Sequence, residues 1–429
     1  MIGRPSAAKG LAIATALGLS LAACASSSQG SSSDAASGGS ADPLALGTIL
    51  PVTGTLSFLN PPMAAGVGLA VDDINAAGGV LGNPVTVENG DSGDTTDLTV
   101  ARGTATDLIG KGVSAVLGAA SSGVSLAVVD QFAEAGVMEV SPANTATDLS
   151  GYGPYFARTS PPDTVQGAAL GAQILDDGHT KVGFLVQNEP YGNGLRDNIE
   201  KAIEAGGAET VYGGTGAGQE FAPGETNFGA QVTDLLAQKP DAIAIVAFEE
   251  TIAIVNELVG QGWDFNGTTY FVDGNLTNYG DKFDPGTLEG VQGTLPGAQA
   301  PGDFQARLKE WSTANGNGEL NDFSYAAEAY DATTLIALAA VRGGATDGKT
   351  ISENIRAVSG GEDGAVEVTT YEEGVKALEG GKQIAFRGKS GIGPLDDNND
   401  PSSAFIGIYK YGADNTYTYV KSVEGKPSE

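Results

Sequence analysis

Short apolar runs alternate with segments of helical periodicity through most of the 429-residue chain. Four runs are each followed by such a segment: 46–50 by 63–75, 113–117 by 122–135, 182–186 by 195–205, and 242–247 by 251–261. Residues 137–140 and 269–272 predict two further strands. Regular alternation of strand and helix implies a parallel sheet with helices on both faces. Because the pattern occurs twice, we predict an α/β protein with two doubly wound, parallel-sheet lobes.

The loops that follow the predicted strands carry the candidate chemistry, since such sheets bind ligands at the carboxyl ends of their strands. Ser121 and Ser122 open the predicted helix at 122–135. A serine there caps the helix, and the free N–H groups of a first helical turn suit a carboxylate. Capping alone would equally explain a serine at this point. Asp273 follows a strand in the second half of the chain and offers a negative charge, so the two halves together are complementary to a zwitterion.

The first 23 residues predict export. Arg4 and Lys9 are followed by an apolar run at 11–19 and then by small residues. This is the pattern of a signal peptide, because the run is shorter than the roughly 20 residues that span a bilayer. The sequence LAAC at 21–24 resembles the bacterial lipobox, in which the cysteine receives a diacylglyceryl group. The alternative is a secreted protein with an unmodified cysteine.

Cys24 is the only cysteine in the chain, so no disulfide forms within it and no catalytic thiol remains. Residues 24–41 are mostly Ser, Gly and Ala, a composition typical of a flexible tether. We therefore expect a protein anchored to the outer face of the cell membrane, or in the periplasm, through a lipid on Cys24. The remaining chain is long enough for two domains.

Acidic residues outnumber basic ones by 53 to 22, and the net charge is −31. Such a surface repels nucleic acid and anionic headgroups, so we expect no nucleic-acid partner. The acids are scattered along the chain rather than gathered in one block. Solubility, in a saline habitat for example, explains them better than an acidic binding tail does.

A set of short motifs resembles the type I periplasmic binding proteins, in particular the branched-chain amino acid (Leu/Ile/Val)-binding group of ABC transporter lipoproteins. The motifs occur in the family's order and at similar spacing. They are LPVTG at 50–54, DINAAGGV at 73–80, DS at 91–92, VSPA at 140–143, YFART at 155–159, YG at 191–192, KPD at 239–241, AYDA at 329–332 and SGIGP at 390–394.

The resemblance implies a set of ligand contacts. The helix-opening serine of the family falls on Ser122, with Ser121 beside it. The contacts to the α-carboxylate fall on the backbone of Ala143 and the hydroxyl of Thr145. Both would also contact the amino group of the ligand. The acid that holds the ammonium falls on Asp273, where close relatives more often have Glu, and Tyr191 would line the cleft.

Two departures from the family pattern bear on selectivity. The aromatic residue of the first lobe that packs on the ligand side chain aligns with Leu59, which follows Phe58. Phe248 begins the segment FEE, where the family has a more polar or aromatic loop. The residues that would contact the α-carboxylate and the α-ammonium are thus present, whereas the sequence does not specify which side chain the ligand carries.

The family fold implies two lobes joined by three crossovers. We expect the first lobe to comprise 42–161 and 300–393, and the second 162–299 and 394–429. The crossovers would fall near 159–162, 294–299 and 393–397. Predicted strands at 404–411 and 417–420 would belong to the second lobe, and the lobes would close on the ligand by hinge motion.

Three other patterns have simpler explanations. GGATDGKT at 343–350 matches a Walker A motif, but a P-loop follows a strand. The preceding residues 326–341 are helical by period, and Thr350 would begin the next helix. His179 is the only histidine, which excludes a Ser-His-Asp triad and a histidine-based zinc site. DDNND at 396–400 lacks the glycine and glutamate of a calcium loop, which favours a turn.

The expected function is therefore a transport receptor, a monomer that hands an α-amino acid, branched-chain by default, to ABC transporter permease subunits. Small amides and aromatic acids are alternative ligands, and a ligand-sensing module for a membrane receptor is an alternative role. A secreted hydrolase is the third alternative, but it would need a nucleophile, a base and an orienting group that cannot be assembled without a usable histidine. An enzyme that uses carboxylates alone stays open, although nothing indicates such a pair. We therefore expect no enzymatic activity, no cofactor and no metal.

Overall fold

The computed structural model describes residues 42–425, so the predicted signal peptide, Cys24 and the tether lie outside the described residues. Five parallel strands form the first sheet, in the order β2-β1-β3-β4-β5. They are β1 (Ala45–Leu50), β2 (Thr86–Asp91), β3 (Ala115–Gly118), β4 (Met138–Ser141) and β5 (Phe156–Arg158). The register across the centre is set by Leu46, which pairs with Val87 of β2 and with Ala115 of β3.

The second sheet has seven strands in the order β14-β13-β10-β9-β8-β6-β7. They are β6 (Lys181–Val186), β7 (Glu209–Tyr212), β8 (Ala242–Val246), β9 (Thr269–Phe271), β10 (Gln292–Pro296), β13 (Ala404–Tyr411) and β14 (Tyr417–Gly425). The strands from β6 to β10 run parallel, and β8 is buried along its whole length. A parallel strand covered by helices on both faces is expected to be uniformly apolar.

The last two strands depart from a purely parallel sheet. β13 runs antiparallel to β10, and β14 runs antiparallel to β13. A short turn joins β13 to β14, and strands joined so closely pair antiparallel. β14 also continues to Gly425, beyond the predicted end at residue 420. The predicted lobe boundaries and hinge segments stay predictions.

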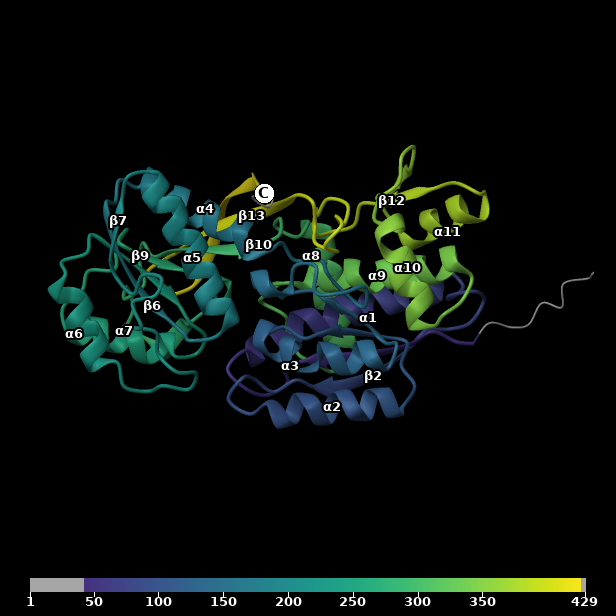
Figure 1. The fold of residues 1–429 in the computed structure, drawn as a ribbon, viewed down its shortest axis with the longest axis horizontal. Helices are drawn as coiled ribbons and strands as arrows, with labels where there is room; N and C mark the ends of the chain where they lie inside the picture. The colour runs from purple at the N-terminus through teal and green to yellow at the C-terminus, as the bar shows by residue number, and fades with distance from the viewer. Residues whose placement is uncertain (1–41, 426–429) are drawn as a thin grey trace, which may run out of the picture. The chain divides into compact units, whose positions relative to one another are not determined.

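Helices cover the faces of both sheets. The helices that accompany the first sheet are α1 (Asn60–Ala76), α2 (Leu98–Gly110), α3 (Ser122–Glu134), α8 (Gly302–Ala314), α9 (Ala326–Gly343), α10 (Gly348–Val358) and α11 (Tyr371–Glu379). Those that accompany the second are α4 (Asp163–Asp176), α5 (Pro190–Ala205), α6 (Gly229–Ala237) and α7 (Thr251–Gly260). A separate pair, β11 (Val366–Val368) and β12 (Ile384–Phe386), lies near α11 (Figure 1).

Helix α9 is the most deeply buried of the described helices. Every residue from 326 to 340 is buried, and the helix packs against α1, α10 and α11 as well as β3 and β4. A helix enclosed on all sides is expected to be largely apolar, which explains the run of Ala and Leu, although Glu328 and Asp331 are buried in it as well.

Two predicted strands begin later than expected. β3 starts at Ala115 and β4 at Met138, because Gly112 and Gly136 turn the chain out of the preceding helices with φ of 75° and 72°. Such a left-handed residue is the usual end of a helix, and the chain enters the sheet only beyond it.

The Walker-like segment joins two helices, as predicted. Gly344 ends α9 with φ of 73°, and the Asp347 side chain caps α10 by accepting a hydrogen bond from Thr350 N at 3.0 Å. The helix begins at Gly348, two residues before the predicted Thr350. No strand precedes the segment, so its backbone does not form a phosphate-binding loop.

Candidate functional site

The loops at the carboxyl ends of neighbouring strands meet in one cavity. β1, β3 and β4 are adjacent in the first sheet, and β6, β8 and β9 are adjacent in the second. Twelve residues line the central cavity. They come from the loops after these strands, from the first turns of α3 and α5, and from the loop before α9. They are Leu56, Leu59, Ala120, Ser121, Ser122, Ala143, Thr145, Tyr191, Phe248, Asp273, Gly274 and Tyr325. Eight of the nine predicted ligand contacts therefore lie together.

The first turn of α3 presents backbone donors to this cavity. Ser121 is the N-cap, and its hydroxyl accepts a hydrogen bond from Val124 N at 3.4 Å. The hydroxyl of Ser122 instead accepts from Thr145 N at 3.3 Å and from Ala146 N at 3.2 Å. The amides of Ser122 and Gly123 have no partner among residues 42–425. Free N–H groups at the positive end of a helix dipole suit an anion.

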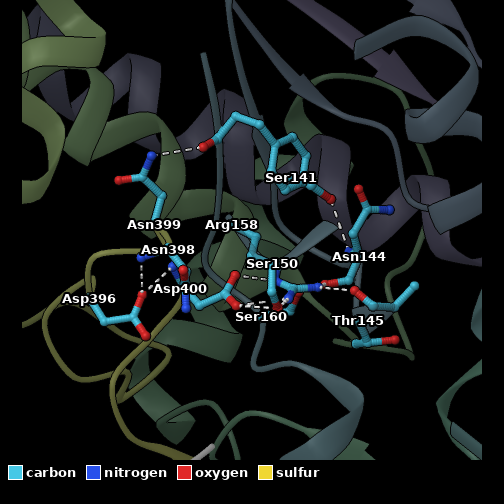
Figure 2. A network of polar contacts seen from close by, with 12 residues as sticks. Ser141, Asn144, Thr145, Ser150, Arg158, Ser160, Asp396, Asn398, Asn399 and Asp400 are labelled. Carbon is cyan, nitrogen blue, oxygen red and sulfur yellow. Dashed lines mark hydrogen bonds and ion pairs between the residues drawn. The ribbon is translucent and has the colours of Figure 1, made fainter. Parts of the chain in front are cut away.

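The loop after β4 is held to the sheet at both ends. Ser141 Oγ donates to Ala119 O at 2.6 Å and accepts from Asn144 N at 2.9 Å (Figure 2). Ser160 Oγ donates to Asn144 O at 2.5 Å, and Arg158 Nη1 donates to Ala146 O at 2.9 Å. This loop carries Ala143 and Thr145, so the network sets their position in the cavity.

A buried ion pair anchors the same network. Arg158 is fully buried, and its Nε and Nη2 donate to the two carboxylate oxygens of Asp400 at 2.6 and 3.0 Å (Figure 2). Ser150 Oγ also donates to Asp400, at 2.6 Å. The segment 396–400 forms a turn, as predicted. Asp400 within this turn pairs with Arg158, which lies 242 positions earlier in the chain.

Asp273 is a buried acid with three donors. Its Oδ1 accepts from Gln166 Nε2 at 2.8 Å and from the Tyr191 hydroxyl at 2.7 Å, and its Oδ2 accepts from the Tyr325 hydroxyl at 2.6 Å. Burial raises the pKa of Asp273, while the hydrogen bonds from Tyr325, Tyr191 and Gln166 oppose that rise. The carboxylate is therefore kept at a fixed place in a largely apolar surrounding.

A second buried acid lies close to the first. Asp163 opens α4 and is fully buried, and the side chain of Thr145 lies within its reach. Burial, reinforced by the charge of Asp273, raises the pKa of Asp163 well above its usual value, and the hydrogen bond from Thr145 opposes that rise only in part. Asp163 does not line the central cavity, so Asp273 is the acid that an ammonium group would meet there.

Apolar side chains form the walls. Leu56 and Leu59 face the cavity from the loop after β1 and the short helix that follows it. Tyr191 stacks on Phe248, with ring centroids 5.4 Å apart and planes at 13°. The cavity has a volume of about 20 Å³, which is close to the space of one water molecule, so an amino acid requires the walls to separate.

Phe58 is the predicted contact that lies outside the central cavity. It lines a second, outer cavity of about 220 Å³, together with Ser57, Ile252, Tyr279 and Lys282. The two cavities share Phe248 and Gly274. Because successive side chains of a 3₁₀ turn point in different directions, Leu59 faces one cavity and Phe58 the other.

Four residues of the central cavity were not predicted: Leu56, Ala120, Gly274 and Tyr325. Tyr325 is the most consequential, because its hydroxyl donates a hydrogen bond to Asp273 from a distant part of the chain. It adopts φ of 59° just before α9, a strained conformation for a tyrosine that is often found at functional positions. A lone tyrosine before a helix carries no such signal in the sequence. Ala120 and Gly274 directly adjoin predicted contacts.

The remaining candidate chemistry lies elsewhere. His179 contacts Gly267 O at 2.9 Å and packs against Tyr270, away from the cavity. Within residues 42–425, no cluster of three His, Asp or Glu side chains is arranged to hold a metal ion. None of the helices in that range has both the length and the apolar character that a membrane span requires.

Comparisons with known proteins agree on one family. The sequence model of the family described as periplasmic binding protein matches residues 43–378. A Leu/Ile/Val-binding protein homolog from Brucella suis is 26% identical over 388 residues, covering 88% of this chain and 93% of the relative. The Leu/Ile/Val-binding protein BraC3 of Rhizobium johnstonii is 31% identical over 202 residues, which cover 47% of this chain and 53% of the relative.

Solved structures show the same fold. LivJ of Streptococcus pneumoniae, crystallised with isoleucine, matches with a TM-score of 0.71 at 22% identity and covers 90% of this chain and 100% of LivJ. The leucine-binding protein LivK of Thermotoga maritima matches with a TM-score of 0.69 at 23% identity, covering 89% of this chain and 98% of LivK. A solute-binding protein of R. palustris in complex with benzoate matches with a TM-score of 0.66 at 17% identity, covering 89% of this chain and 96% of that one. The relatives are solute-binding proteins rather than enzymes.

Proposed function

Because the chain belongs to the periplasmic binding protein family, we propose that it captures an α-amino acid in the central cavity and delivers it to the permease of an ABC transporter. One observation carries the proposal. Ser122, whose backbone amide is free, and Asp273, a buried acid, line the same cavity. These are the two groups that the carboxylate and the ammonium of a zwitterion require.

Ligand identity is tested by isothermal titration calorimetry with a panel of L-amino acids. An amino acid present at 100 times its Kd raises the unfolding free energy by about 2.7 kcal/mol, so a thermal-shift screen ranks the panel first. Binding to an ABC permease, rather than to a signalling receptor, is tested by co-purification with membrane proteins from the native cell.

A plain carboxylic acid is the second candidate. Asp163 and Asp273 both have raised pKa values because they are buried. Burial that raises the pKa of an acid favours its protonated form, which can donate a hydrogen bond to a ligand carboxylate. The R. palustris relative that was crystallised with benzoate shows that the fold accommodates such a compound. Benzoate and α-keto acids therefore belong in the panel.

The outer cavity favours a bulky apolar side chain on the ligand. It adjoins the central cavity at Phe248 and Gly274, and Phe58, Ile252 and Tyr279 line it. Its volume of about 220 Å³ exceeds the roughly 150 Å³ of a cavity that holds benzene. A ligand whose α-groups occupy the central cavity would extend past Phe248 into this space, so we expect phenylalanine to bind at least as well as leucine.

Filling the outer cavity changes selectivity. We expect Ile252→Trp to weaken phenylalanine binding by about tenfold and to leave alanine binding unchanged. A tenfold loss corresponds to about 1.4 kcal/mol, the loss of one well-packed contact. Val259→Trp is the matched control, since Val259 lies exposed on the same helix, outside the residues that line the cavity. Calorimetry with the two amino acids measures both effects. Equal losses for phenylalanine and alanine would contradict the assignment of this cavity to the side chain.

The lipid anchor is proposed on sequence alone. Cys24→Ala should move the protein from the membrane fraction to the soluble fraction with the same ligand affinity, because residues 24–41 separate the anchor from residues 42–425. Membrane fractionation after a salt wash checks the first result and calorimetry the second. A Cys24→Ala protein that stays with the membrane would disprove the anchor and leave the proposed binding function untouched.

A further inference from the structure

A third cavity shares Tyr325 with the central cavity. It is lined by residues of the chain from 321 to 328, which leads into α9, by residues of β10, β13 and β14, and by parts of the chain near 278 and 298–305. Its volume is about 460 Å³, which is within the usual range of small-molecule sites. No residue that lines it carries a positive charge, and one of them, Glu328, carries a carboxylate.

Aromatic rings surround this space. Tyr409, Tyr417, Tyr419, Phe323 and Tyr325 all line it. Tyr409 meets Tyr417 and Tyr419 edge to face, with centroids 5.3 and 5.6 Å apart. Lys309 Nζ, 5.5 Å from the centroid of Phe323, is an example within the chain of a cation on one of these rings. Several aromatic rings that line one space are the composition found in sites that bind ammonium ions.

Glu328 carries the one carboxyl group among the residues that line the cavity. Its side chain is 3% exposed and makes no hydrogen bond or ion pair with another residue in 42–425. The carboxyl group of Glu328 packs against the backbone of Gly297, which follows β10. Its Oε1 occupies the space that a Cβ atom on Gly297 would need, 2.0 Å from the position of that atom. By contrast, the neighbouring Asp331 accepts hydrogen bonds from Lys389 N and Ser390 Oγ. A buried acid without a partner is costly unless a counter-charge meets it.

We propose that this aromatic cavity is a second binding site, selective for a small organic cation such as a quaternary or primary ammonium compound. The tyrosine and phenylalanine rings would enclose the cation, and Glu328 would supply the opposite charge. Burial raises the pKa of Glu328 well above its usual value, and the neighbouring Asp331 raises it further. A bound cation would lower that pKa again by stabilising the carboxylate.

Occupancy of this site is linked to the central cavity through Tyr325. The ring of Tyr325 lines both cavities, and its hydroxyl donates to Asp273. The walls are further joined by the Tyr417 hydroxyl, 3.3 Å from Asp322 Oδ2. A cation held between these walls would stabilise the arrangement in which Tyr325 bonds Asp273, so the two ligands would strengthen each other's binding.

The test uses tetramethylammonium chloride as the probe and potassium chloride at the same concentration as the salt control. Nuclear magnetic resonance of ring-labelled tyrosine should show shifts for Tyr409 and Tyr417 with the probe alone. We expect Glu328→Gln to weaken the probe at least tenfold, and Tyr417→Leu, at a half-buried position, to weaken it as well. Glu319→Gln is the matched control, because Glu319 is exposed and lies outside the cavity lining.

Shifts that potassium chloride reproduces, or equal probe affinity in wild type and both cavity variants, would overturn the second site. Asp273→Asn separates this proposal from the proposed amino-acid function. Shifts of Tyr409 and Tyr417 that persist in that variant show that the probe does not occupy the central cavity, and because Tyr325 links the two sites we expect a smaller loss of probe affinity than in Glu328→Gln. Loss of probe binding in Asp273→Asn, with Glu328→Gln unaffected, would instead assign the cation to the central cavity and refute the second site.

Discussion

Asp273→Ala is expected to weaken α-amino-acid binding by at least about tenfold and by up to about a thousandfold. Truncating one partner of a buried charge pair costs about 2–5 kcal/mol, and Asp273 is buried with its carboxylate held by three donors. The alanine variant also leaves the hydroxyls of Tyr191 and Tyr325 without their acceptor. Calorimetry measures the loss, and thermal unfolding shows whether the variant keeps its fold.

Two comparisons sharpen that experiment. Asp284→Ala removes an exposed acid from the same part of the chain, and we expect it to leave affinity unchanged. The α-keto acid that matches the best amino acid keeps the carboxylate but lacks the ammonium, so it should bind wild type weakly and Asp273→Asn more strongly. Ser122→Ala should cost less than Asp273→Ala, because the amides of the α3 first turn remain. A keto acid that binds wild type as tightly as the amino acid would rule out the zwitterion and favour a plain acid.

Arg158→Met should lower the unfolding free energy by about 3–5 kcal/mol, the cost of leaving a buried charge without its partner. Asp400 would keep only Ser150 as a side-chain donor, and the carbonyl of Ala146 would lose the guanidinium. Because that guanidinium also holds the loop of Ala143 and Thr145, ligand affinity should fall with stability. Urea unfolding measures the first effect and calorimetry the second.

The double variant Arg158→Met with Asp400→Leu tests the cause. Replacing both members of a buried ion pair by apolar residues is often close to neutral, so the double variant should recover much of the stability lost in Arg158→Met. Arg102→Met, at an exposed position on α2, serves as the control for removing an arginine. A double variant as unstable as the single one would mean that the hydrogen bonds of Arg158 to the loop, rather than its charge, stabilise the fold.

The alternation of apolar runs and helical segments determined the fold class, because the periods of strands and helices are properties of neighbouring residues. The same local logic predicted an anion site at the first turn of α3, since Ser121 and Ser122 stand directly after a buried strand. It also excluded a nucleotide site at 343–350, which joins two helices. The family resemblance rested on motifs that are likewise contiguous in sequence.

Only the tertiary structure decided which distant residues meet. Tyr325 reaches Asp273 across 52 positions of sequence, and Arg158 reaches Asp400 across 242. Neither pairing leaves a periodic signal, because each depends on how separate strands and helices are placed. The division of Phe58 and Leu59 between two cavities has the same origin. A residue's type and neighbours specify what it can bond, whereas packing of remote elements specifies which partner it finds.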